Sequence, residues 1–550
     1  MKKILFLFSF LICTSLFSQQ EDAWLFLIDK PNRTTFLENP LTMLSQRALD
    51  RRNAQNIALD VLDVPVDESY FNQLKGEGNI IVFAKSKWLN AVHVQGTESQ
   101  INNLLTSFTF IDHIEFANKS LSKSGKKKLN SMVSNHHQKL NETETTFTYG
   151  DAENQIKMLK GDFLHEQNLT GTGQQIAVID AGFPNVNTLE AFKRLRDNNQ
   201  ILGGYDFVNR NDNFYTGNNH GTNVLSTIGG YLENEFVGSA PDASFYLFIS
   251  EDSSREVPLE ESLWVEAAER ADSLGVDVIN TSLGYTTFDE DKYNYSYADM
   301  NGKTTFISRG AEIGTTRGML LVVSAGNDGN KSWKYISAPG DASSVITVGA
   351  VDAAGAIADF SSFGPSSDGR IKPEVLAQGK NPAIIQHATG EVITTSSGTS
   401  FSGPIMAGLI ACLNENKTSE IIQNRNLLLK NSVYESADKF SNPLDQHGYG
   451  IPNFEVALNS YIESTASVQK AFLSNLLIHP NPVNDSFTLD LNNNNLENYS
   501  IQIFNILGKK VFEESKMKSK NINISILESG IYLLKIHNGN QNKTLKLIKN

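Results

Sequence analysis

The chain has 550 residues, which at roughly 150 residues per domain predicts three or four folding units. Apolar residues make up 40% and charged residues 20%, a composition that excludes an intrinsically disordered chain. The formal net charge of −14 argues against nucleic acid as a partner, because phosphate binding needs clustered positive charge. The two cysteines, Cys13 and Cys412, cannot build a disulfide framework.

The first 18 residues have the order of charge and hydrophobicity that is typical of an export signal. Lys2 and Lys3 precede the apolar run 4–16, and the small residue Ser18 comes before Gln19. This order predicts a secretory signal peptide over 1–18, with a buried N-terminal strand as the alternative. The run is too short to span a bilayer, and no other stretch approaches that length. We therefore expect an exported, soluble protein with no transmembrane anchor in its mature form.

Residues 19–117 predict a small α+β unit, followed by an exposed linker over 118–149. Strands are expected at 25–28, 80–83 and 91–94, with helices at 44–53 and 98–105. The linker carries six lysines, five of them within 119–128, and few large apolar residues. Because a Lys-rich linker between folded units is easy to cut, we expect a maturation site within it.

Residues 150–462 alternate apolar strands with helical patterns. The strands are expected at 176–179, 243–249, 276–280, 319–323 and 345–348, and the clearest helix at 259–274. Continuous apolar strands separated by helices predict an α/β fold, in which helices cover both faces of a doubly wound, mostly parallel sheet.

The remainder predicts a short linker over 463–473 and a small all-β domain over 474–550. Polar and apolar residues alternate over 500–506 and 521–526, and 531–536 is a third expected strand.

Two segments of the α/β region carry polar groups where active sites form. Asp180 ends the strand 176–179, and carboxyl ends of parallel strands are the usual place for sites. His220 opens a helical segment, and an imidazole held by a carboxylate can accept a proton at neutral pH. Taken singly, an Asp after a strand is more often a turn or cap residue, and an isolated His-Gly is more often a surface or capping histidine.

A third segment, Gly398 to Pro404, precedes a strongly apolar helix. Ser400 lies at the amino end of that helix, where free N–H groups and the dipole favour developing negative charge. The alternative is an ordinary serine N-cap. Cys412, farther along the helix, is interpreted as a buried apolar residue and not as a second nucleophile.

Together these motifs resemble the subtilisin-like serine peptidases, the subtilase family. The order Asp180, His220, Ser400 matches that family, as do the surroundings Ile-Ala-Val-Ile-Asp180, His220-Gly-Thr, Ser-Ala-Gly-Asn327 and Gly-Thr-Ser400-Phe-Ser-Gly-Pro. The resemblance covers residues 150–462 and implies a subtilisin-like fold.

The resemblance also implies roles for particular residues. Ser400 would be the nucleophile, His220 the general base and Asp180 the group that orients His220. Asn327 is similar to the family's oxyanion-hole asparagine. Ser282, Leu283 and Gly284 resemble the segment that pairs with substrate backbone as an added strand, which suits protein or peptide substrates.

Two features bear on how closely the chain follows the family. Ala181 stands where the family usually has Ser or Thr, so one hydroxyl beside Asp180 is lost. The acidic loop 285–305 could hold Ca²⁺, which many family members bind, but no ligand spacing is recognisable. We therefore favour a solvated acidic loop and predict no cofactor and no metal.

The flanking units resemble parts found around such peptidases. Residues 19–117 resemble the inhibitory propeptides of subtilases, with a permanent binding module as the alternative. The tail 474–550 resembles the C-terminal sorting domain of the type IX secretion system of Bacteroidetes, with motifs at 479–485, 503–509 and 527–532. A carbohydrate- or matrix-binding module is the alternative for the tail.

The sequence thus predicts a secreted serine endopeptidase made as a zymogen. It would reach the cell surface or the medium through the periplasm, with the type IX secretion machinery as a partner. The alternative from another class is a catalytically inactive subtilase scaffold that acts as a surface binding protein.

Overall fold

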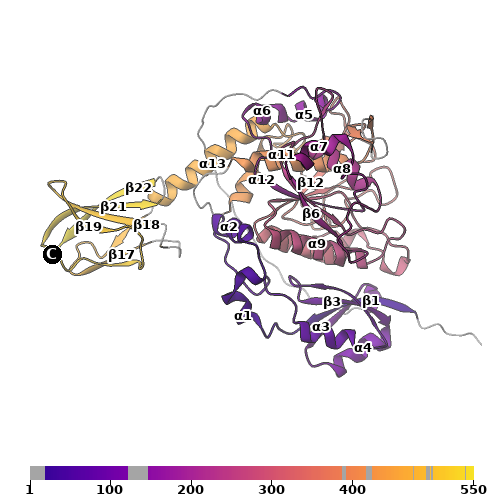
Figure 1. Cartoon of the computed structure of the whole chain (residues 1–550), viewed down its shortest axis with the longest axis horizontal. Helices are drawn as coiled ribbons and strands as arrows, with labels where there is room; N and C mark the ends of the chain where they lie inside the picture. Colours follow the sequence, from indigo (N-terminus) through magenta and orange to yellow (C-terminus); the bar gives the residue numbers. More distant parts are fainter. Residues whose placement is uncertain are drawn as a thin grey trace, which may run out of the picture.

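The computed structural model describes residues 19–121, 147–386, 392–416, 424–474, 476–490, 496, 499–538 and 541–550. The predicted signal peptide and residues 122–146 of the predicted linker lie outside this part of the chain. Figure 1 shows an indigo N-terminal unit against a larger central unit, and a long helix that leads from the central unit to a yellow β-rich unit.

The N-terminal unit is a four-stranded antiparallel sheet in the order β2-β3-β1-β4, covered by helices. Its inner strand β1 pairs with both β3 and β4, so its apolar side chains are buried. The α+β prediction for this unit is confirmed, although it missed α1, α3 and β4. The elements are β1 (Gln20–Leu27), α1 (Arg33–Glu38), α2 (Gln46–Ala54), α3 (Glu68–Lys75), β2 (Ile81–Ser86), β3 (Ala91–Thr97), α4 (Glu98–Ser107) and β4 (Ile111–Phe116).

The central unit is built on a seven-stranded sheet in the order β13-β12-β11-β10-β5-β9-β6. Each neighbouring pair runs parallel, which confirms the predicted doubly wound α/β fold. The strands are β5 (Gln175–Asp180), β6 (Ile201–Asp206), β9 (Ser244–Ile249), β10 (Val278–Thr281), β11 (Leu320–Ser324), β12 (Ile346–Val351) and β13 (Val375–Gln378).

Helices cover both faces of this sheet because successive strand residues point to opposite sides. In β5, Ile176 and Val178 pack with α8 (His220–Gly229) and α11 (Thr399–Glu415). Ala177 and Ile179 pack with α9 (Leu259–Leu274) and α10 (Phe306–Thr316) on the other face. The side chains of β5 are therefore buried on both faces, which explains the continuous apolar runs in the sequence.

Further elements complete the central unit. They are α5 (Glu153–Lys157), α6 (Gly161–Glu166), α7 (Lys193–Asp197), β7 (Tyr231–Leu232), β8 (Phe236–Val237), β14 (Ala383–Ile385), β15 (Ile393–Thr395), α12 (Arg425–Glu435) and α13 (Phe454–Ser474). The range 463–473, predicted as a linker, is the second half of α13, the helix that leads to the C-terminal unit in Figure 1.

The C-terminal unit holds a three-stranded sheet, β16-β17-β20, and a four-stranded sheet, β19-β18-β21-β22. Both contribute to one apolar core that contains Phe487, Ile501 and Leu534. This confirms the predicted small all-β domain. The strands are β16 (Ile478–His479), β17 (Ser486–Leu489), β18 (Tyr499–Asn505), β19 (Lys510–Glu514), β20 (Asn521–Asn523), β21 (Gly530–Asn538) and β22 (Gln541–Lys549).

The sheet of the N-terminal unit lies against α9 and α10. Trp24 of β1 stacks on Phe306 with ring centroids 4.7 Å apart, and its indole N–H donates to Ser262 Oγ at 2.8 Å. The buried Glu269 of α9 accepts from Ser86 Oγ at 2.6 Å and from the Trp88 backbone N–H at 2.9 Å. Because these contacts are buried and hydrogen-bonded, the N-terminal and central units form a specific, well-packed interface.

Candidate active site

Asp180 ends β5 at the carboxyl edge of the sheet and is completely buried. Its Oδ1 accepts two hydrogen bonds, from the Ala181 backbone N–H at 2.8 Å and from His220 Nδ1 at 2.8 Å. Its Oδ2 is buried and has no hydrogen-bond partner among the described residues. One oxygen of this carboxylate therefore holds the histidine, while the other is unsatisfied.

His220 is the first residue of α8, so the start of that helix places its ring beside Asp180. The second residue of α8, Gly221, lets the helix come close to the backbone that follows Asp180. A side chain there would not fit, because a Cβ at Gly221 would lie 2.5 Å from Gly182 O. Burial lowers the pKa of His220, but the Asp180 charge and hydrogen bond outweigh it, and the pKa rises from its ordinary value to about 9. The side chain is 32% exposed and accessible from outside.

Ser400 lies in the first turn of α11, as the sequence predicted. The neighbouring Phe401 ring is 6.0 Å from the His220 ring, which brings Ser400 to the same edge of the sheet as the Asp180–His220 pair. In this structure the Ser400 hydroxyl donates to Ser282 O at 3.3 Å and not to His220. Catalytic hydrogen bonds are often loose without substrate and tighten when it binds, so this contact leaves Ser400 a candidate nucleophile.

Asn327 follows β11 and is oriented by the helix that carries Ser400. Its Oδ1 accepts from the Thr399 backbone N–H at 2.8 Å and from Thr399 Oγ1 at 3.0 Å. No hydrogen bond donated by its Nδ2 is found in the described part of the chain. With the amide oxygen fixed in this way, the two Nδ2 protons are the donors left to face a ligand beside Ser400.

The segment Ser282, Leu283 and Gly284 follows β10 and runs beside the start of α11. Ser282 Oγ donates to Ser400 O at 3.0 Å, while Leu283 is buried and Gly284 is exposed. A Cβ at Gly284 would lie 2.2 Å from Ser337 Oγ, so only glycine fits there without a shift. The structure thus brings all seven residues predicted for the site to one edge of the sheet.

Two residues of this region were not predicted from the sequence. Thr399 orients Asn327, although the Gly-Thr-Ser motif that contains it was recognised. Glu251 comes directly after Ser250, whose backbone N–H donates to Asp180 O at 3.1 Å. Burial and the nearby Asp180 charge raise the pKa of Glu251 to about 7. No motif indicated Glu251, because a single Glu after a strand carries no pattern.

Replacing Ala181 by serine should stabilise the protein, because a hydroxyl at this position can donate to the unsatisfied Asp180 Oδ2. A buried acceptor without a partner costs about 1–3 kcal/mol, so we expect Ala181→Ser to raise the free energy of unfolding by about 1 kcal/mol. Ala177→Ser, a buried alanine of β5 away from the carboxylate, is the control and should lower the free energy of unfolding. Urea unfolding of the wild type and the two variants measures the free energy of unfolding. Equal decreases of that free energy in both variants would contradict the expectation.

The acidic loop 285–305 does not gather its carboxylates around one point. Asp289 accepts from the Glu256 backbone N–H, Glu290 pairs with Lys292, and Asp299 pairs with Lys119. In the part of the chain that the structure describes, no three His, Cys, Asp or Glu side chains form a group that could hold a metal ion. These residues do not fit a Ca²⁺ site in this loop, and the absence of a cofactor stays a prediction.

Cys412 is completely buried in α11, as predicted, and its Sγ lies 3.3 Å from Ser239 O. Burial raises the pKa of its thiol well above the ordinary value. Such a thiol stays protonated, which supports its interpretation as a packing residue.

Three segments of the chain match known sequence families. The family described as "Subtilase family" matches residues 171–451, about half of the chain. The "Peptidase S8 propeptide domain, Bacteroidota" matches residues 22–134, and the "Secretion system C-terminal sorting domain" matches residues 477–550. The predicted resemblances of the central, N-terminal and C-terminal units are thereby confirmed. None of the helices that the structure describes has the length and apolar character needed to cross a membrane.

Named proteases are similar to this chain over about half of its length. Serine protease AprX of Bacillus subtilis (strain 168) is 28% identical over 316 residues, which are 52% of this chain and 67% of that protein. Subtilisin DY of Bacillus licheniformis is 29% identical over 306 residues, which are 55% of this chain and 97% of that protein. Among solved structures, the prenylagaramide maturation protease PagA has a TM-score of 0.42 and 22% identity, covering 55% of this chain and 98% of that one.

Proposed function

The chain belongs to the subtilase family of serine endopeptidases, and on that premise we propose that it cleaves proteins through an acyl-enzyme formed on Ser400. The observation that carries the proposal is the hydrogen bond from His220 Nδ1 to the buried Asp180 Oδ1, at the edge of the sheet where α11 begins. The alternative of an inactive binding scaffold has no such support, since each catalytic position holds a competent residue.

Acylation would begin with attack of Ser400 Oγ on the scissile carbonyl carbon. His220 Nε2 takes the hydroxyl proton as the C–O bond forms, and Asp180 stabilises the resulting imidazolium through Nδ1. His220 then gives the proton to the leaving amine as the C–N bond breaks. A water molecule, deprotonated by the same nitrogen, hydrolyses the ester and restores Ser400.

Two donors are placed to stabilise the oxyanion of the tetrahedral intermediates. One is Asn327 Nδ2, whose amide is oriented by Thr399, and the other is the Ser400 backbone N–H in the first turn of α11. A donor of this kind is worth about 3–4 kcal/mol of transition-state stabilisation, a value known from subtilisin itself. Ser282 to Gly284 would pair with the substrate main chain, which favours extended protein segments.

The pH dependence of activity should follow the protonation of His220, because only its neutral form can accept the Ser400 proton. With a pKa of about 9, kcat/KM should rise with pH until about pH 9. The Glu251 carboxylate contributes to the raised pKa of His220, so Glu251→Gln should lower that pKa and move the rise to lower pH. Asp252→Asn removes a neighbouring charge that does not act on His220, and its profile should match that of the wild type. Rates of peptide hydrolysis from pH 5 to 11 give the pH profile of the wild type and of both variants. A Glu251→Gln profile that coincides with the wild-type profile would contradict the effect of Glu251 on the pKa of His220.

We further propose that the protein is made as a zymogen and exported across the outer membrane by the type IX machinery, with its sorting domain as the address. The N-terminal propeptide and the C-terminal sorting domain support this. The proposal includes the domain limits: the propeptide at 19–117, the linker at 118–149, the peptidase domain at 150–462 and the sorting domain at 474–550.

Intact mass of the full chain tests the zymogen proposal. The wild type should lose its N-terminal unit by a cut within 118–149, while Ser400→Ala should stay full length under the same conditions. Processing of Ser400→Ala in the absence of any other protease would refute self-cleavage.

A further inference from the structure

The first residues of the linker place a lysine against the central unit. Lys119 follows β4, and its Nζ lies 4.1 Å from the centre of the Tyr295 ring and 2.6 Å from Asp299 Oδ2. The nitrogen is buried, although the side chain as a whole is 38% exposed. Burial lowers the pKa of Lys119, and the charges of Asp299 and Glu261 oppose that decrease. An aromatic face with two carboxylates is a typical site for a cationic side chain, so we call Glu261, Tyr295 and Asp299 the cation site.

The cation site is held in place by contacts within the central unit. Asp299 Oδ2 accepts from the Ser296 backbone N–H at 2.7 Å and from Ser296 Oγ at 2.8 Å. The Tyr295 hydroxyl donates to Glu261 Oε1 at 2.7 Å, and its ring meets the Phe288 ring edge-on with centroids 5.5 Å apart. Because none of these contacts involves Lys119, we expect the site to keep its shape when the lysine leaves.

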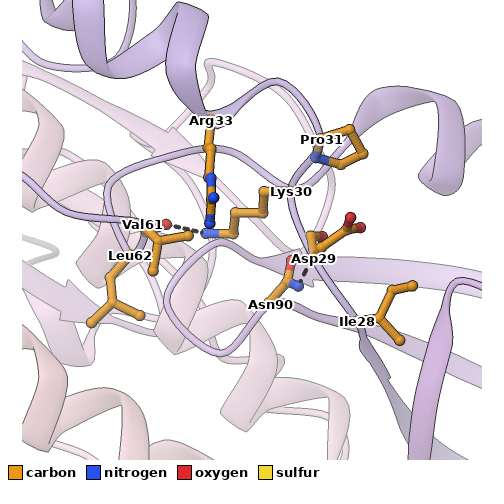
Figure 2. Close-up of a pocket in the computed structure, with 8 residues that line it drawn as sticks. All are labelled: Ile28, Asp29, Lys30, Pro31, Arg33, Val61, Leu62 and Asn90. Carbon is orange, nitrogen blue, oxygen red and sulfur yellow. Dashed lines mark hydrogen bonds between the residues drawn. The ribbon is translucent and has the colours of Figure 1, made fainter.

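A lysine of the N-terminal unit with a purely structural role is satisfied differently. Lys30 is buried, and its Nζ donates to Val61 O at 2.7 Å, to Val64 O at 2.6 Å and to Lys87 O at 2.6 Å. Figure 2 shows the first of these bonds. All three acceptors are backbone carbonyls of the same unit. The ammonium of Lys119 instead meets side chains of the central unit, so its binding site belongs to the peptidase domain.

An aromatic row joins the cation site to the substrate-pairing segment 282–284. Tyr285 comes directly after that segment, and its ring stacks on the Phe288 ring with centroids 6.1 Å apart. Phe288 in turn contacts Tyr295, the aromatic wall of the cation site. An extended substrate advances about 3.3 Å per residue, so a substrate paired with 282–284 would reach the cation site within a few residues.

The region between the substrate-pairing segment and the cation site is acidic. Tyr285 is completely buried, and its hydroxyl has no hydrogen-bond partner among the described residues. Burial raises the pKa of this hydroxyl, and the charges of four glutamates raise it further: Glu260, Glu251, Glu256 and Glu261. Burial and neighbouring carboxylates also raise the pKa of Glu256 and of Glu260 to about 8, so both are mostly charged at pH 9. A negative field of this kind favours a cationic side chain over a neutral or acidic one.

We propose that the cation site determines specificity: when Lys119 leaves after the linker is cut, the site binds a lysine or arginine side chain of the substrate. This rests on the proposed function, in which a cut within 118–149 removes the N-terminal unit. A substrate lysine would make the contacts that Lys119 makes, with the Tyr295 ring and the Asp299 carboxylate. A guanidinium group suits the same site, because it stacks on aromatic rings and pairs with carboxylates.

The test uses the full chain after its own processing and peptides of one sequence with a single cleaved bond. One lysine is moved along the peptide position by position, and each lysine peptide is compared with its norleucine analogue, which keeps the aliphatic part without the charge. At one position, lysine should raise kcat/KM about 10-fold over norleucine at pH 9, and glutamate should lower it.

Variants of the loop show whether the cation site causes this preference. Asp299→Asn and Tyr295→Leu should each reduce the lysine-to-norleucine ratio of kcat/KM to about twofold or less. The matched control is Asp291→Asn, which removes an exposed carboxylate of the same loop that accepts from Asn294 Nδ2 and lies outside the site. Its ratio should stay at about 10-fold.

Equal kcat/KM for lysine and norleucine at every position would overturn the proposal, as would the same ratio in Asp299→Asn and Asp291→Asn. If no peptide is cleaved, the proposed function fails, and binding decides the inference. Fluorescent forms of the peptides are then titrated onto the Ser400→Ala chain, after an added sequence-specific protease has cut the linker and the N-terminal fragment has been separated. Anisotropy should show the lysine peptide binding about 10-fold tighter than its norleucine analogue, and equal affinities would overturn the proposal.

Discussion

Ser400→Ala should lose about a million-fold in kcat on casein or a peptide substrate, while its fold is retained. Loss of the nucleophile has this size in subtilisin, since the remaining groups cannot form the acyl-enzyme. The serine hydroxyl makes one long hydrogen bond, 3.3 Å to Ser282 O, so its removal should change the free energy of unfolding by about 1 kcal/mol or less. Initial rates and urea unfolding of both proteins measure the two effects.

The matched control is Ser402→Ala, two residues farther along α11. Ser402 is completely buried and donates to Thr399 O at 3.1 Å, so it differs from Ser400 by facing the interior. This variant should keep activity within about tenfold of the wild type while losing about 1 kcal/mol of stability. Comparable activity of Ser400→Ala and Ser402→Ala would exclude Ser400 as the nucleophile.

Asp180→Ala should lose about ten-thousand-fold in kcat, because His220 would lose both its orientation and its compensating charge. Asp180→Asn should be at least ten times more active than Asp180→Ala. The reason is that one oxygen, Oδ1, accepts from both the Ala181 N–H and His220 Nδ1. We expect the asparagine oxygen to take that position, because the Ala181 N–H can donate only to an acceptor, and the same oxygen then accepts from His220 Nδ1.

Steady-state kinetics at several pH values separate these two variants. Asp180→Asn should also reach its maximal rate at lower pH, since removing the Asp180 charge lowers the pKa of His220. Equal rates for the two variants would mean that the amide presents its N–H₂ to His220 and imposes the wrong tautomer.

The architecture of the peptidase domain follows from its sequence pattern because buried parallel strands need apolar side chains on both faces. The runs 176–179 and 319–323 correspond to β5 and β11, and the pattern 259–274 coincides with α9. Shorter elements such as α3 and β4 were missed. A half-buried segment of six to eight residues has too few apolar positions to show whether they repeat with the period of a helix or of a strand.

The site was predictable as a set of motifs but not as a network of contacts. Asp180, His220, Ser400 and Asn327 stand in recognisable local sequences, so their meeting at one edge of the sheet could be expected. The hydrogen bonds from Thr399 to Asn327 and the charge of Glu251 beside Asp180 depend on backbone positions far apart in the chain. The same holds for Arg52, whose partners Asp63 and Asp272 come from different domains.

Labelling with a serine-directed phosphonate tests the central claim most directly. The wild-type protein, after removal of its propeptide, should gain the mass of one adduct, and peptide mapping should locate that adduct on Ser400. His220→Ala should label far more slowly, because the hydroxyl then has no base. An unlabelled protein, or an adduct on another residue, would contradict the account that Ser400 is an activated nucleophile.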